Sequence, residues 1–192
     1  PLVIADRCVV RAPFHEDFPK CDYEIVIEPN MAFGTGNHET TYMMMEHILE
    51  TDQKNKSVLD MGCGTGILSI LSSMNGALYI TSIDIDKWSF DATTENAQIN
   101  KCFNIKSILG DASSIPDEEF DIIYANIQKN IILGDMPEYI KVMKPEGLIF
   151  FSGFYNDDLT DIEKAAEDLG LSFINKKVRN NWCSAKFKRM KK

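Results

Sequence analysis

The sequence predicts an α/β fold: a mostly parallel sheet of seven strands with helices on both faces and an antiparallel strand at the C-terminal end. Three observations predict it. From residue 57 onward, short apolar runs typical of strands alternate with amphipathic segments of helical length. A glycine-rich loop, 62–66, joins the first of these strands to a helix. The last two strands are separated only by Arg179-Asn180-Asn181, so they form a hairpin and one of them runs antiparallel.

The remaining elements follow in order along the chain. Residues 1–22 contain two short apolar stretches and resemble a leader or linker, and residues 23–28 alternate as a strand does. A glycine-bearing loop then leads into a helix that continues to about Glu50. Asn75-Gly76 and Gly170 are typical of helix C-termini. The expected strands are 58–60, 79–83, 105–109, 120–125, 148–152, 171–178 and 182–188, and the expected helices between them are 67–74, 87–100, 135–143 and 158–169.

Length and composition fit one globular domain, which we expect over residues 23–192. The chain has 192 residues, of which 44% are hydrophobic and 26% charged. It has no apolar run near the roughly 20 residues of a membrane helix and no signal-peptide pattern, so we expect no membrane contact. The five cysteines include no C-x-x-C pair, which favours reduced thiols in the cytoplasm over a disulfide framework or a zinc cage.

The charge balance is acidic. The chain has 29 acidic and 20 basic residues, a formal net charge of −9. A field of that sign disfavours nucleic acid and attracts basic partners, although solubility alone also explains it. We expect a monomer that does not bind nucleic acid directly. The chain begins with Pro1 rather than methionine, so we expect a fragment or a processed chain.

The loop Gly62-Cys-Gly64-Thr-Gly66 follows a predicted strand and opens a predicted helix. Ligands bind at this place in open parallel sheets, because glycine lets the backbone approach closely and the helix N–H groups face polar ligand groups. Asp84 ends the next strand, where a carboxylate can accept hydrogen bonds from both ribose hydroxyls. Asp86 is better placed than Asp84 to cap the following helix. Gly62, Gly64 and Asp84 therefore predict a nucleoside-containing cofactor.

These features alone do not identify the cofactor, since nicotinamide dinucleotide sites share them. Two details favour S-adenosylmethionine. Ile67 occupies the sixth position of the motif, where the dinucleotide fingerprint has Gly or Ala. The sheet also ends in a strand pair without an intervening helix. Asp111, after the third strand, is placed to accept the adenine amino group, with a surface acid in a loop as the alternative.

Asn126 ends the fourth strand, which in this architecture faces the reacting end of the cofactor. Its side chain has an acceptor and a donor that can hold an amine and aim its lone pair, and capping the next segment is the alternative role. Methyl transfer to nitrogen needs no triad or metal, because positioning can be worth about 7–11 kcal/mol. We expect no metal site: His38-Glu39 begins like H-E-x-x-H, but Tyr42 stands at the fifth position. Cys63 has no histidine near it in sequence to activate it as a nucleophile.

Several segments together resemble the ribosomal protein L11 methyltransferase family. The resemblance covers about residues 20–189, and its most particular parts are the A-F-G-T-G-x-H-x-T-T segment and A-N-I. The segments are Met-Ala-Phe-Gly-Thr-Gly-Asn-His-Glu-Thr-Thr at 31–41, Val-Leu-Asp-Met-Gly-Cys-Gly-Thr-Gly at 58–66, Ile-Asp-Ile-Asp at 83–86, Glu-Asn-Ala at 95–97, Ala-Asn-Ile at 125–127 and Ser-Gly at 152–153.

This resemblance implies a Rossmann-like class I methyltransferase fold. It also implies that S-adenosylmethionine donates methyl groups to amines, mostly lysine, of a large-subunit ribosomal protein. Family members carry an N-terminal domain that grips the substrate, so the resemblance identifies residues 1–22 as its linker and puts turnover by this chain alone in doubt. The residues that match cofactor contacts of the family are Thr41, Gly62, Asp84 and Asn126, and those expected to form a mobile lid over the cofactor are Phe33, Gly34 and Gly36.

Two other functions stay open. The first is a methyltransferase that acts on nucleic acid or a small molecule. Enzymes that methylate amino groups of flipped bases usually carry Asn-Pro-Pro-aromatic after strand four, whereas Ile127-Gln128 follows Asn126 here. The second is a nucleotide-binding module or dehydrogenase, which NAD binding would distinguish from a methyltransferase.

Overall fold

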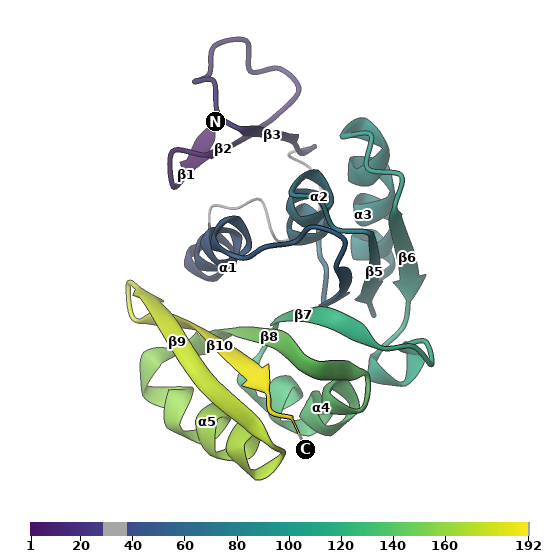
Figure 1. Cartoon of the computed structure of the whole chain (residues 1–192). Coiled ribbons are helices and arrows are strands. Elements are labelled where there is room, and N and C mark those ends of the chain that lie inside the picture. Colours follow the sequence, from purple (N-terminus) through teal and green to yellow (C-terminus); the bar gives the residue numbers. More distant parts are fainter. Residues whose placement is uncertain (29–37, 192) are drawn as a thin grey trace.

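A computed structural model describes residues 1–28 and 38–191. Its main sheet has the strand order β6-β5-β4-β7-β8-β10-β9 (Figure 1). Neighbouring strands from β6 to β8 pair in parallel, and β10 pairs antiparallel with both β8 and β9. The predicted seven-stranded, mostly parallel α/β fold is therefore confirmed. The strands are β4 (Ser57–Met61), β5 (Tyr79–Asp84), β6 (Ile105–Leu109), β7 (Phe120–Asn126), β8 (Met143–Tyr155), β9 (Leu171–Arg179) and β10 (Trp182–Arg189).

Helices cover both faces of the sheet. Figure 1 shows α1, α2 and α3 on one side and α4 and α5 on the other. The longer elements on these faces are α1 (Glu39–Glu50), α2 (Ile67–Met74), α3 (Lys87–Ile99), α4 (Lys129–Lys141) and α5 (Leu159–Asp168), with short 3-10 turns at Ala112–Ser114 and Asn156–Asp158. No helix in the described ranges is long and apolar enough to cross a membrane.

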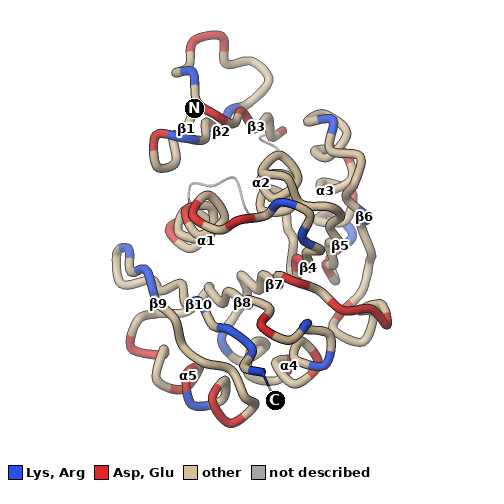
Figure 2. Tube along the Cα trace, viewed as in Figure 1, with Lys and Arg blue, Asp and Glu red and all other residues tan. Residues whose placement is uncertain are grey.

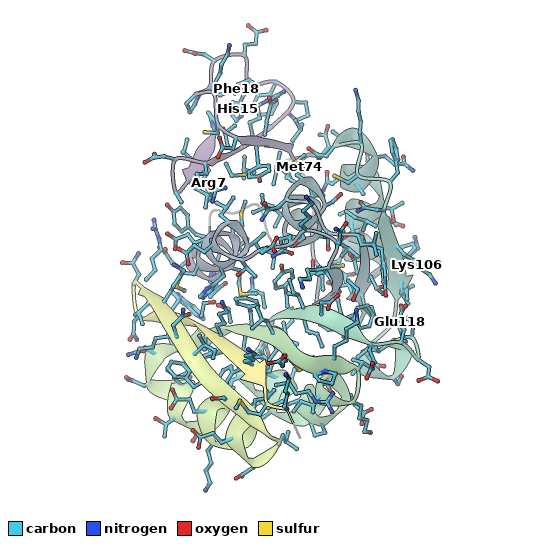
Figure 3. All side chains as sticks on the ribbon, viewed as in Figure 1. Arg7, His15, Phe18, Met74, Lys106 and Glu118 are labelled. Carbon is cyan, nitrogen blue, oxygen red and sulfur yellow. The ribbon has the colours of Figure 1, made fainter. Side chains whose placement is uncertain are left out.

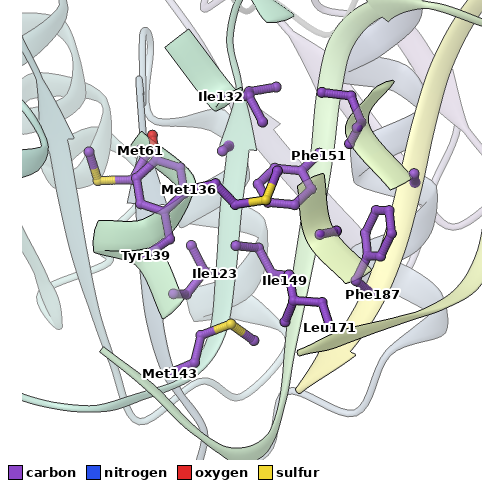
Figure 4. Close-up of a cluster of buried hydrophobic side chains, with 14 of the residues drawn as sticks. Met61, Ile123, Ile132, Met136, Tyr139, Met143, Ile149, Phe151, Leu171 and Phe187 are labelled. Carbon is purple, nitrogen blue, oxygen red and sulfur yellow. The ribbon is translucent and has the colours of Figure 1, made fainter. Parts of the chain in front are cut away.

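Side chains along the central strands alternate between the two faces of the sheet and contribute to two separate hydrophobic cores. Successive side chains of a strand point to opposite faces. Ile122 and Tyr124 of β7 pack with α1 and α2, whereas Ile123 between them packs toward α4 and α5. The α4 side of this arrangement is drawn in Figure 4. Both faces are apolar because both are covered, as a parallel sheet requires.

The N-terminal residues form a small second sheet of β1 (Leu2–Ile4), β2 (Cys8–Arg11) and β3 (Tyr23–Val26). Its buried side chains, among them Ile4 and Ile25, join the core that contains α1 and α2. Arg7, labelled in Figure 3, donates to the backbone carbonyl of Leu49 near the end of α1 over 2.7 Å. Residues 1–28 therefore pack on α1 and α2.

Two predicted boundaries were wrong. The helix expected at 135–143 is α4, which begins at Lys129 and ends at Lys141. Its start carries no side-chain cap from Gln128, and Pro137 inside it lacks the N–H of a normal helix position, so the usual signals were missing. The strand expected at 148–152 extends over Met143–Tyr155, although its first part contains Glu146 in a left-handed conformation.

Candidate functional site

A cavity of about 1050 Å³ opens at the carboxyl ends of the parallel strands β4, β5 and β7. This is the place where open α/β sheets bind ligands. The cavity brings together all the described residues that the sequence singled out for cofactor binding or catalysis. Those residues are Thr41, Gly62, Gly64, Asp84, Asp111 and Asn126. The remaining candidates, Phe33, Gly34 and Gly36, lie outside the described residues.

The glycine loop between β4 and α2 has a backbone that other residues would rarely adopt. Gly62, Gly64 and Gly66 have φ angles of +69°, +56° and +80°. A Cβ atom on Gly62 would lie 2.3 Å from the Ile127 side chain. The loop is also anchored to α3, because the Thr93 hydroxyl of that helix donates to the Gly64 carbonyl over 3.0 Å. The conformation of the loop is therefore fixed by contacts within the protein, and its backbone lines the cavity.

Asp84 joins this loop to the end of β5. One carboxylate oxygen accepts the Gly64 N–H over 3.0 Å, and the other accepts the Asp86 N–H over 2.9 Å. An ionised carboxylate has about four acceptor positions, so two of them remain for a ligand. Asp86 caps α3 by accepting the Trp88 N–H, which confirms the capping role expected for Asp86.

Asp111 lies on the cavity wall after β6. Its carboxylate accepts the N–H of Ser113 over 2.9 Å and the Ser113 hydroxyl over 2.5 Å, and these bonds lower the pKa of the Asp111 carboxyl. It therefore caps a 3-10 turn and faces the cavity at the same time. Ile85, which is 72% exposed, lines the same part of the cavity.

Asn126 and Thr41 meet at the opposite part of the cavity. The Asn126 side-chain amide donates to the Thr41 hydroxyl over 3.2 Å. Thr41 is in the first turn of α1, and His38 caps that helix by accepting the Thr40 N–H on its ring nitrogen. His38 therefore fixes the start of the helix.

An aromatic wall beside this pair was not expected from the sequence. Trp182 lines the cavity and stacks on Tyr155, with ring centroids 4.2 Å apart. The His38 ring meets Trp182 edge-on at 4.9 Å. These rings come from β10, β8 and the start of α1. The pairing of β10 with β8 and the packing of α1 beside β10 bring them together. The hairpin turn before Trp182 was the only signal near it in the sequence.

Two titratable groups, one in the glycine loop and one in the strand before it, are buried. Burial raises the pKa of the Cys63 thiol well above its usual value, which disfavours a thiolate nucleophile in the glycine loop. Burial also raises the pKa of Asp60, under the loop, to about 7, while the Ser69 hydroxyl donates to it over 2.6 Å. Among the described residues, no group of three His, Cys, Asp or Glu side chains could hold a metal ion.

Comparison with known proteins gives consistent matches. The family model described as "Ribosomal protein L11 methyltransferase (PrmA)" matches residues 1–190. A ribosomal protein L11 methyltransferase of Phocaeicola vulgatus is 50% identical over 188 residues, which cover 97% of this chain and 67% of that protein. One of Porphyromonas gingivalis is 47% identical over 188 residues, covering 97% of this chain and 65% of that protein.

Solved structures agree with the sequence matches. The crystal structure of a ribosomal protein L11 methylase from Lactobacillus delbrueckii subsp. bulgaricus superposes with a TM-score of 0.87 at 30% identity, covering 96% of this chain and 94% of that one. The M. jannaschii TYW2 structure in complex with AdoMet has a TM-score of 0.60 at 19% identity over 76% of this chain and 74% of that one, a likeness of fold alone.

Proposed function

Because the chain belongs to the ribosomal protein L11 methyltransferase family, we propose that it transfers methyl groups from S-adenosylmethionine to lysine amines of a large-subunit ribosomal protein. One observation carries this proposal. A single cavity contains a glycine loop, an acid at the end of the second strand, and an asparagine oriented by a threonine. The first two suit a nucleoside cofactor, and the third suits an amine acceptor.

The cavity fits the cofactor in size and in the placement of polar groups. Ligand pockets commonly have volumes of about 300–1,000 Å³, so a volume of about 1050 Å³ is in keeping with a cofactor of this size. We assign the ribose hydroxyls to Asp84 and the adenine to the surface made by Ile85 and Asp111. The methionine part then lies along the glycine loop toward the start of α1, where helix N–H groups favour its carboxylate.

The cofactor, when bound, supplies a methyl group already activated on a sulfonium, so the protein's task is positioning. Asn126 can accept an N–H of the incoming amine with its side-chain carbonyl, which directs the nitrogen lone pair toward the methyl group. The hydrogen bond to Thr41 fixes the rotation of that side chain. Such alignment can account for several kcal/mol of the barrier, with about 7–11 as an upper range.

The aromatic wall at Trp182 suits the proposed acceptor. A lysine side chain has an apolar stem that can pack against an aromatic ring. The net charge of −9 attracts a basic ribosomal protein over longer distances.

Two measurements test this function. Calorimetric titration should show that the chain binds S-adenosylhomocysteine and not NAD. Incubation with radiolabelled S-adenosylmethionine should label a basic large-subunit ribosomal protein on lysine, identified by mass spectrometry, and should leave ribosomal RNA unlabelled. Binding of NAD in place of S-adenosylhomocysteine would remove the cofactor assignment, and labelled RNA with unlabelled protein would remove the acceptor assignment.

A further inference from the structure

The β9–β10 hairpin lies beside α1 (Figure 1), and its turn contacts Glu39 at the start of that helix. Asn180 and Asn181 close the hairpin in left-handed conformations, with φ of +46° and +67°. The Arg179 guanidinium donates to the Glu39 carboxylate, and the Asn180 amide donates to it over 2.6 Å. Figure 2 shows the corresponding charges, basic at the hairpin tip and acidic on α1.

Arg179 makes a second contact with the same helix. Its guanidinium carbon lies 3.9 Å from the centroid of the Tyr42 ring. Glu39 and Tyr42 are three residues apart, so they stand on one face of the helix. A guanidinium can bond a carboxylate and stack on a ring at once, which an ammonium group does less well. Arg179 therefore restrains both the axial position and the rotation of this helical turn.

The restrained turn also carries a residue of the cavity. Thr41 lies between Glu39 and Tyr42 in sequence, lines the cavity, and accepts the hydrogen bond of Asn126. Arg179 is not among the described residues that line the cavity. Its contacts with Glu39 and Tyr42 connect it to the site through α1, while its strand partner Trp182 also lines the cavity.

We propose that Arg179 is a positioning residue that, through Glu39 and Tyr42, holds the first turn of α1 where it binds the carboxylate end of the cofactor and orients Asn126. This inference rests on the function proposed above. It predicts an effect that depends on which part of the ligand is present. Replacing Arg179 should not change the affinity for the adenosine part, which is assigned to Asp84 and Asp111.

Lys177 offers a matched control. It lies on the same strand and bonds Glu50 over 2.8 Å, at the opposite end of α1. The two ion pairs thus join the same two elements, one beside the cavity and one away from it. Exposed ion pairs contribute little to stability, so Arg179→Ala and Lys177→Ala should both fold.

The experiment compares two ligands by calorimetric titration. S-adenosylhomocysteine has the carboxylate, and 5′-methylthioadenosine keeps the adenosine and sulfur but lacks it. Arg179→Ala should weaken S-adenosylhomocysteine binding about tenfold and leave 5′-methylthioadenosine binding within about twofold. Lys177→Ala should change neither. Arg179→Lys, which retains the charge, should recover part of the loss.

Other outcomes would overturn the positioning role of Arg179 or the proposed function. Equal loss of both ligands by Arg179→Ala, or no loss beyond that of Lys177→Ala, would overturn the positioning role. If Arg179→Ala does not fold, Glu39→Gln takes its place, with the same selective loss expected and the same results overturning the role. Wild-type protein that binds neither ligand would refute the proposed function and this inference together, whereas wild-type binding without selectivity in the variants refutes the inference alone.

Discussion

Asn126 at the end of β7 and Thr41 in the first turn of α1 are joined by a hydrogen bond of 3.2 Å across 85 residues of sequence. The bond links the sheet that carries the assigned acceptor site to the helix assigned to the cofactor's carboxylate. A change at either residue should therefore affect how the two reactants are aligned.

Replacing Asn126 by alanine should lower kcat about a hundredfold, since misalignment of reactants by about 1 Å costs that much. Steady-state methylation of the ribosomal protein at saturating substrate measures this effect. Thr41→Val, which keeps the shape and removes the hydroxyl, should give a smaller loss in the same direction. A kcat for Asn126→Ala within threefold of wild type would remove Asn126 from the methyl-transfer step.

Asp84→Ala should weaken S-adenosylhomocysteine binding at least tenfold, about 1.4 kcal/mol, because two hydrogen bonds to a carboxylate are lost. Asp86→Ala is the control in calorimetric titration. Asp86 caps α3, so its loss should cost about 1 kcal/mol of folding stability and leave the dissociation constant unchanged. Equal effects of both variants on binding would contradict the assignment of Asp84 to the ribose.

Gly153→Ala and Gly134→Ala should shift stability in opposite directions. A Cβ on Gly153 would lie 2.2 Å from the Ile127 carbonyl oxygen, at a φ of +99°, so this variant must move backbone beside the cavity. Gly134 lies inside α4 with nothing within 4 Å of its Cβ position, and alanine there should add up to about 1 kcal/mol. Urea unfolding of both variants checks the signs. A stable Gly153→Ala protein would show that the Ile127 backbone is free to move.

His47 should make the protein less stable as pH falls. Burial, assisted by the charges of Lys177 and Lys186, lowers the pKa of His47 to about 4 in the folded state, below its usual 6.5. The unfolded chain then binds the extra proton first, so stability falls as pH decreases from about 6.5 toward 4, by at most about 3 kcal/mol. His47→Gln should show a shallower fall in urea unfolding over this range. Parallel curves for variant and wild type would mean that His47 titrates alike in both states.

Elements whose ends are marked by residues close in sequence were predicted with the correct bounds. The strand Ile105–Leu109 and the helix Ile67–Met74 have the predicted bounds, since the helix follows the glycine loop and Asn75-Gly76 ends it. The proximity of Gly64 and Asp84 was also predictable, because a strand–helix–strand unit always brings these two positions together.

The aromatic wall could not be predicted in this way. Its geometry depends on the pairing of Trp182 with Tyr155 and on a bulge between Cys183 and Ser184. Such a register is set by long-range pairing, which no local pattern encodes. The start of α4 was missed for a different reason, because nothing in its first turn resembles a cap.

The position of β10 between β8 and β9 has a consequence for biosynthesis. The last strand of the sheet to leave the ribosome is an interior one, so β9 has no partner in this sheet until β10 has been synthesised. Trp182 arrives with that strand, and the hairpin contact of Arg179 with Glu39 can form only once the turn is complete. A nascent chain that ends before β10 can already hold the glycine loop and Asp84, but it lacks the wall beside Asn126. Catalytic competence should therefore appear only after β10 has been synthesised, when the half assigned to the nucleoside can already have folded.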